Sequence, residues 1–334
     1  MFYQFSENQM KQISAEEIDP GILTVGCLNV DELYALNGIF GFGETTLAAC
    51  KNAKEVFRSG VEVHPTYTFT ELRILNDHED ADDYIALYMK RNLMLVVDIS
   101  DEDGSTRSMY MSAVQKYSAK QISCEKALAA FFDALLSDDY TVLESIEVDL
   151  SEQEESLFEK KIDKDFNRSL LKTKKLLTKR HSYYAQLMDI ADAVCENDND
   201  IFDESNLIYV DNVSKRVSRL LGDTSDLKNT VEHLQDAYSS YLDSNMNKTM
   251  KIFTVLTSIF FPLTIIVGWY GMNFQYMPEF AWKLGYVYVI ILSVVTVLVF
   301  AIIGKWKSGF DNKISYNITL LCSQFDDILI PMIL

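Results

Sequence analysis

Cysteine and histidine are scarce in this chain, and their spacing argues against two classes of protein. The 334 residues include five Cys and four His, and no two Cys form a Cys-x-x-Cys pair. An odd number of scattered Cys argues against a disulfide framework and favours a reducing compartment. The His residues have neither His-x-x-x-His nor His-Glu-x-x-His spacing, so a zinc enzyme has no support. We see no nucleophile–base cluster either, and we expect no enzymatic activity.

Basic residues are also in deficit. The chain has 30 Lys and Arg against 49 Asp and Glu, a formal net charge of −19. Residues 251–334 hold five Lys and four acidic residues, so residues 1–250 carry about −20. Nucleic-acid binding needs Lys and Arg against phosphates, and this balance argues against such a partner. The acidic charge permits a role with cations, although it also simply keeps a domain soluble.

Signals for nucleotide binding and secretion are missing as well. Residues 41–46, Gly-Phe-Gly-Glu-Thr-Thr, lack the third Gly of a dinucleotide loop and the Lys of a phosphate-binding loop. The first residues have no basic region followed by an apolar core, so we expect no signal peptide. The first 250 residues should therefore stay in the cytoplasm.

Charge is absent from two long segments, 252–270 and 284–304. Each holds about 20 residues, enough to cross ~30 Å of hydrocarbon as a helix. Basic residues flank the pair on its outer sides, at Lys248, Lys251, Lys305 and Lys307. Because basic residues favour the cytoplasmic side, we expect a transmembrane hairpin with both chain termini in the cytoplasm.

The soluble part mixes strand-like and helical patterns. Strand-like runs occur at 21–28, 61–64, 67–72 and 92–99, and from about residue 125 the pattern is almost continuously helical. Two long helices are predicted, at about 165–193 and 206–270. In the second, a heptad seam recurs at alternating steps of four and three residues: Val213, Val217, Leu220, Thr224, Leu227, Val231, Leu234, Tyr238 and Tyr241. We expect one stalk helix of ~95 Å, which either transmits motion to the membrane or serves as a spacer.

The string Tyr-Gly-Met-Asn-Phe at 270–274 closes the first charge-free segment, and Met-Pro-Glu follows at 277–279. This motif, with two membrane helices after a large acidic domain, resembles the CorA-type magnesium/cobalt transporter family over roughly residues 1–307. The resemblance implies an α+β cytoplasmic domain, with a mixed sheet and helices on both sides, joined by a stalk helix to a transmembrane hairpin. It further implies a homopentameric pore in the cell membrane that takes up divalent cations, chiefly Mg²⁺, with cobalt or nickel tolerated.

The expected layout along the chain follows from these patterns. It comprises a cytoplasmic α/β domain with a helical arm (1–205), the stalk helix (206–251), a pore-lining first transmembrane helix (252–270), an outer loop (271–283), a second transmembrane helix (284–304) and a cytoplasmic tail (305–334). The tail beyond residue 308 is too short and polar for a third span, and it is either a docking segment or an extension without structure.

One stripe of the first span has the composition of a pore lining. Its members lie at steps of three and four: Met250, Phe253, Thr257, Phe261, Thr264, Gly268 and Gly271. Two spans cannot enclose an ion path, so several copies must surround it. The resemblance places Asn247 at the cytoplasmic pore mouth, with Met250 and Phe253 as an apolar constriction that gates by dewetting. Thr side chains also join membrane helices, so a packing role for the stripe is the alternative.

The Gly271-Met272-Asn273 motif would form the selectivity filter. Mg²⁺ releases water reluctantly, so a site can bind it with its hydration shell intact. The amide of Asn273 and the carbonyl of Gly271 offer neutral oxygens that hold the hydrated ion weakly enough to release it. Glu279 in the outer loop would gather cations near the filter. The membrane potential supplies the driving force, at ~2.3 kcal/mol per charge per 100 mV.

The regulatory magnesium site of the family looks degraded here. Family members often carry two acids after a Leu near the first helix of the domain, where this chain has Ala48 and Ala49 after Leu47. In the family, these acids pair with an Asp on the stalk helix of a neighbouring subunit. The corresponding stalk position in this chain is Asn212, and Asp211 could serve as a metal ligand if the register shifts by one. The alternatives to magnesium uptake are a zinc transporter of the same superfamily and a non-conducting membrane sensor or scaffold.

Overall fold

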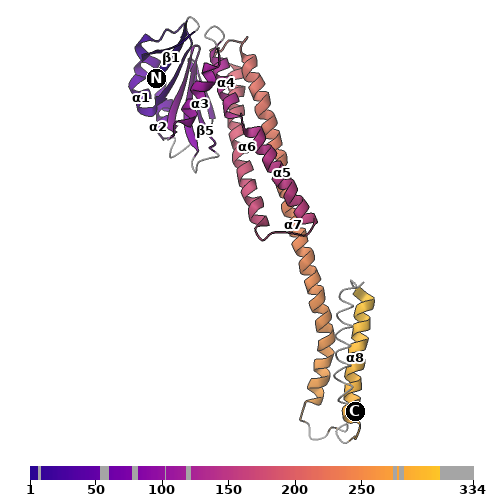
Figure 1. Cartoon of the computed structure of the whole chain (residues 1–334). Helices are drawn as coiled ribbons and strands as arrows, with labels where there is room; N and C mark the ends of the chain where they lie inside the picture. Colours follow the sequence, from indigo (N-terminus) through magenta and orange to yellow (C-terminus); the bar gives the residue numbers. More distant parts are fainter. Residues whose placement is uncertain are drawn as a thin grey trace. The chain divides into compact units, whose positions relative to one another are not determined.

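Figure 1 shows the computed structural model of the chain. It describes residues 1–6, 9–52, 60–76, 82–101, 103–117, 122–273, 277 and 282–308. The chain divides into two compact units, Met1–Tyr238 and Ser239–Leu334. The boundary falls inside the expected stalk helix. The tail from residue 309 and the outer-loop residue Glu279 lie outside the described residues.

The first unit is built on a seven-stranded sheet. Its strands are β1 (Phe2–Ser6), β2 (Gln9–Ile13), β3 (Thr24–Asn29), β4 (Gly60–His64), β5 (Tyr67–Ile74), β6 (Asp83–Lys90) and β7 (Leu93–Ser100). Their order across the sheet is β2-β1-β3-β7-β6-β5-β4. Only the β3–β7 pair is parallel among the neighbouring strands described, so the predicted mixed sheet is confirmed.

The sheet differs from the sequence-based expectation in where β3 begins and in three strands that were not expected, β1, β2 and β6. The strand predicted from residue 21 begins at Thr24, because Gly21 donates its N–H to the Asp19 side chain at 2.8 Å and turns the chain there. Strand β6 was not expected. Six of its eight residues are buried, which leaves no alternation of polar and apolar residues for a pattern to detect.

Helices cover both faces of the sheet, as predicted. On one face, α1 (Val30–Phe40) and α2 (Glu44–Asn52) pack through a buried aromatic group in which the Phe42 and Tyr88 rings lie 4.2 Å apart. On the other face lie α3 (Ser105–Gln115) and α4 (Cys124–Leu135), where Tyr110 and Phe131 meet edge to face at 5.2 Å. Two apolar cores therefore sandwich the sheet.

Three long helices complete the first unit: α5 (Asp139–Phe158), α6 (Phe166–Glu196) and the first part of α7 (Leu207–Tyr270). They lie side by side in Figure 1. The two long predicted helices correspond to α6 and α7. The heptad seam is buried at Val213, Val217, Leu220, Thr224, Val231 and Leu234. It ends at the unit boundary, where the Tyr238 ring packs on Phe166 with centroids 5.0 Å apart. Beyond it, Met246 and Met250 are exposed in the single chain.

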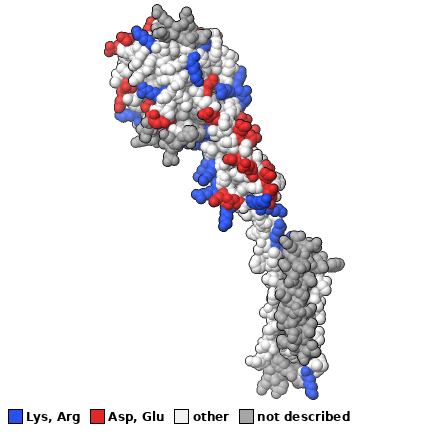
Figure 2. Space-filling model, in the orientation of Figure 1, with Lys and Arg blue, Asp and Glu red and all other residues white. Residues whose placement is uncertain are grey.

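The second unit contains the rest of α7 and α8 (Gly285–Ser308). Helix α7 is long and apolar enough to cross a membrane, with an 18-residue window of mean hydropathy 2.0 in which no residue is buried. Helix α8 covers the second predicted span, and its apolar stretch Gly285–Phe300 is exposed along one side. Charged side chains gather on the first unit, and the described atoms of the second unit that are visible in Figure 2 are mostly uncharged.

Candidate cation pathway

The membrane part of α7 has two distinct faces. Partly covered residues recur along one side, at Val255, Ile259, Pro262, Leu263, Ile266 and Tyr270. At 100° per residue, the predicted pore stripe lies on the opposite side of the helix. Each member of that stripe is exposed in the single chain: Met250, Phe253, Thr257, Phe261, Thr264, Gly268 and Gly271. The geometry thus groups the stripe on one surface that is free to face other copies of the chain.

The hydroxyls of the stripe are oriented by their own helix. Thr257 donates to the carbonyl of Phe253 at 2.8 Å, and Thr264 donates to the carbonyl of Phe260 at 2.9 Å. Each hydroxyl hydrogen is therefore used inside α7, while the oxygen lone pairs remain available as acceptors. Such oxygens can accept hydrogen bonds from the water shell of a cation.

Large apolar side chains alternate with these hydroxyls. Phe253 and Phe261 are 60% and 65% exposed, and Met250 precedes them on the same stripe. Asn247 is exposed as well, three residues before Met250. Proline 262 cannot donate to the carbonyl of Ser258, yet α7 continues through it. Because Pro262 lies on the partly covered face, we do not count it in the pathway.

The end of α7 positions the Gly-Met-Asn motif. The N–H of Gly271 donates to the carbonyl of Val267 at 2.9 Å, and the N–H of Met272 donates to that of Trp269 at 3.3 Å. A Cβ at Gly271 would lie 2.9 Å from the Val267 carbonyl oxygen, closer than side chains tolerate. A glycine is required here for the chain to leave the helix. The exposed Asn273 then stands just beyond the helix end.

The positions of the family's regulatory site lie in the first unit. Ala48 is exposed on α2, and Ala49 is partly covered beside the buried Cys50. On α7, Asn212 is exposed and Asp211 is partly exposed. The Asp211 carboxylate accepts a hydrogen bond from Lys215 at 2.6 Å, so it already has a cationic neighbour on its own helix.

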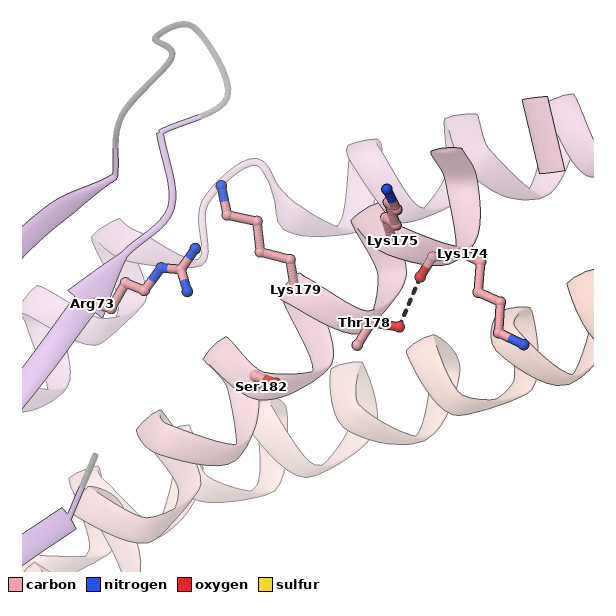
Figure 3. A pocket seen from close by; sticks show the side chains of 6 residues that line it. All are labelled: Arg73, Lys174, Lys175, Thr178, Lys179 and Ser182. Carbon is pink, nitrogen blue, oxygen red and sulfur yellow. Dashed lines mark hydrogen bonds between the residues drawn. The ribbon is translucent and has the colours of Figure 1, made fainter. Parts of the chain in front are cut away.

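A basic cavity of about 550 Å³ opens beside α6. It is lined by Arg73, Lys174, Lys175, Thr178, Lys179 and Ser182, which Figure 3 shows from close by. Asp82 bridges two of them, accepting from Arg73 Nε at 2.6 Å and from Lys179 Nζ at 2.5 Å. Burial alone would raise the pKa of Asp82, but these two cations outweigh it and lower the pKa. None of the six lining side chains is acidic, so the lining offers divalent cations no carboxylate ligand, and we do not count this cavity in their path.

Comparisons with known proteins agree over most of the chain. A model of the family described as CorA-like Mg²⁺ transporter protein matches residues 27–305. The cobalt/magnesium transport protein CorA of Thermotoga maritima is 25% identical over 292 residues, which cover 84% of this chain and 81% of that protein. The magnesium transport protein CorA of Helicobacter pylori is 31% identical over 133 residues, or 39% of this chain and 40% of that protein.

Solved structures share the fold. The complete structure of the CorA magnesium transporter from Methanocaldococcus jannaschii superposes with a TM-score of 0.72 at 21% identity, covering 93% of this chain and 98% of that one. The cytoplasmic domain of ZntB from Vibrio parahaemolyticus superposes with a TM-score of 0.58 at 14% identity, covering 73% and 97%. At these identities the likeness concerns the fold alone. The family match runs from strand β3 into helix α8, and the chain therefore belongs to the CorA-like Mg²⁺ transporter family.

Proposed function

We propose that copies of this chain form a channel-like pathway that takes up divalent cations, chiefly Mg²⁺, across the cell membrane. Family membership supports the transport of divalent cations, and the relatives named above are magnesium or cobalt transport proteins. The observation that carries the channel mechanism is the exposed stripe of α7, opposite the partly covered face and ending at Gly271.

The composition of the stripe suits an ion that keeps its water. Oxygen acceptors at Thr257 and Thr264 and the neutral amide of Asn273 can hydrogen-bond a hydration shell without stripping it. Along α7, Phe261 lies between Thr257 and Thr264, and Phe253 precedes both. These aromatic side chains resist wetting, and a charged ion does not cross a constriction that holds no water. The same stripe can therefore conduct when it is wet and close when it is dry.

The pathway requires several copies, because one α7 and one α8 cannot surround a pore. A homopentamer would place five stripes around one axis and five Asn273 amides at its end. The positive-inside rule puts the first unit and the tail in the cytoplasm, with residues 271–283 outside. An inside-negative potential then draws in a divalent ion with ~2.3 kcal/mol per charge per 100 mV.

Ion flux into liposomes tests this function. Purified full-length protein in vesicles should admit Mg²⁺, and an inside-negative potential should increase the rate. Cobalt should compete with Mg²⁺. Uptake of zinc without Mg²⁺ would instead identify a zinc transporter, and absence of flux for all three ions would identify a sensor or scaffold.

A further inference from the structure

Three carboxylates meet at one end of the β6–β7 ladder, in the first unit. Tyr84 of β6 pairs with Ser100 of β7. The next residues outward, Asp83 and Asp101, therefore come together where β6 begins and β7 ends. Asp103 follows in the connection to α3. One carboxylate oxygen from each residue lies within 4.8 Å of the others. Strand pairing therefore gathers three acids that are up to 20 positions apart in the sequence.

The backbone of the β7–α3 connection holds these side chains in place. One Asp101 oxygen accepts the N–H of Arg107 at 3.1 Å, and Asp103 accepts the N–H of Ser105 at 2.8 Å. Two hydroxyls, those of Ser105 and Thr106, donate to one Asp83 oxygen at 3.2 and 2.9 Å. The surroundings are thus rich in oxygen.

Asp101 carries a second observation that is independent of the clustering. The residue is only 8% exposed, and its Oδ1 atom accepts no hydrogen bond from the described residues. Asp83 is 5% exposed. None of the ion pairs found in the described part of the chain includes any of the three acids. A buried carboxylate oxygen without a donor is costly, and two neighbouring carboxylates raise that cost by repulsion.

We propose that Asp83, Asp101 and Asp103 bind a Mg²⁺ ion inside one subunit. A divalent cation would give the Asp101 Oδ1 atom a partner and cancel the repulsion among the three carboxylates. The donors are all oxygens, which hard cations prefer, whereas zinc sites favour nitrogen and sulfur. Around octahedral Mg²⁺, with ligands at ~2.1 Å, neighbouring ligands stand about 3 Å apart and opposite ligands about 4.2 Å apart, so three oxygens within 4.8 Å of one another would draw closer on binding or reach the ion through a bridging water.

This site differs from a regulatory site shared between subunits. It uses ligands from β6 and from the β7–α3 connection of a single chain, and it does not involve Ala48, Ala49 or Asn212. Ion binding would link the connection that precedes α3 to the first residue of β6. The inference concerns ion binding in the first unit, and it stands or falls independently of transport.

Counting bound Mn²⁺, a spectroscopic substitute for Mg²⁺, tests the site directly. Full-length protein in detergent would be titrated with Mn²⁺ and free ion measured by electron paramagnetic resonance. Two variants of the cluster, Asp101→Asn at the buried ligand and Asp103→Asn at the exposed ligand, should each bind one Mn²⁺ fewer per subunit than the wild type. Asp149→Asn, which removes one exposed charge from α5, is the matched control and should bind as the wild type does.

Thermal unfolding provides a second readout with a distinctive sign. Without divalent cations, Asp101→Asn should raise the Tm, because it removes a carboxylate from a repelling group. Added Mg²⁺ should then raise the Tm less in this variant than in the wild type or Asp149→Asn. Equal Mn²⁺ counts in the wild type and both cluster variants would overturn the proposal. Displacement of the bound Mn²⁺ by Ca²⁺ but not by millimolar Mg²⁺ would overturn its assignment to magnesium.

Discussion

Asp211 accepts a hydrogen bond from Lys215, one turn later on α7, at 2.6 Å. The pair is partly exposed, and such pairs contribute only ~0.3–0.5 kcal/mol on a helix. It nevertheless gives Asp211, which is adjacent to the family's regulatory position at Asn212, a local cation. On α2, Ala48 and Ala49 offer no side-chain oxygen. A divalent ion shared between subunits at this position would therefore find few ligands.

The first prediction concerns this weakened regulation. Asp211→Ala should shift the inhibition of flux by internal Mg²⁺ only slightly, because the α2 positions that carry acids in the family are Ala48 and Ala49 here and have no side-chain oxygen. Ala49→Asp combined with Asn212→Asp should strengthen that inhibition by supplying opposed carboxylates. Flux measured against internal Mg²⁺, with protease protection of the first unit, checks both variants. A sharp magnesium-dependent closure that Asp211→Ala removes would instead place Asp211 in the sensor position.

The second prediction concerns the filter. Asn273→Ala removes the amide that stands just beyond the end of α7, and it should abolish Mg²⁺ uptake while the oligomer stays intact. The matched control is Thr296→Ala on α8, whose hydroxyl bonds to the Leu292 carbonyl of its own helix. That control should transport normally. Normal flux in Asn273→Ala vesicles, with equal protein content, would rule out the assignment of the filter.

The third prediction concerns the gate. Phe253→Gly should raise Mg²⁺ flux or leak at saturating internal Mg²⁺, because a glycine at this point no longer keeps the neck dry. Phe300→Gly on α8 makes the same substitution away from the stripe and controls for the loss of helix propensity. If flux is unchanged across internal concentrations in Phe253→Gly, this residue does not control the pathway.

The fourth prediction concerns a buried ion pair of the first unit. The guanidinium of Arg180 on α6 donates to the carboxylate of Asp139 at the start of α5, and the Arg180 side chain is 1% exposed. Asp139→Ala should lower the free energy of unfolding by ~3–5 kcal/mol, because it leaves a buried charge without this partner. Asp133→Ala, which breaks the more exposed pair with Arg216, should cost about 1 kcal/mol or less. Denaturant unfolding of the two variants gives the comparison, and equal losses would contradict the difference in burial.

The fifth prediction concerns the thiols. Burial raises the pKa of Cys27 to about 11 and that of Cys50 to about 12, so few thiolates form at pH 8. Both residues should resist iodoacetamide in the native protein and react fully in denaturant, because unfolding restores an ordinary thiol pKa. Peptide mass spectrometry reads the modification at each site. Labelling of native Cys50 as fast as in denaturant would mean that α2 opens readily.

The features of this protein that the sequence alone predicted are those that depend on residues close together in the chain. The charge-free segments, the heptad seam through Val217 and Leu220, and the stripe from Met250 to Gly271 depend on hydropathy and periodicity. These properties are set by neighbours along one helix. The helix that was expected over residues 206–270 accordingly matches α7 almost to the residue. The Gly-Met-Asn string indicated the family. Its glycine is also a local requirement, because a Cβ at Gly271 would collide with the backbone at the end of that helix.

Tertiary structure decided the features that join distant parts of the chain. Strand β6 escaped the sequence analysis because its burial removes the alternating pattern. Without β6, nothing indicates that Asp83 lies beside Asp101, or that Asp82 reaches Lys179 on α6. Spacing along a chain fixes contacts only within a helix or a turn. Contacts between carboxylates and their partners on other elements depend on strand order and register, which the packing of the whole unit determines.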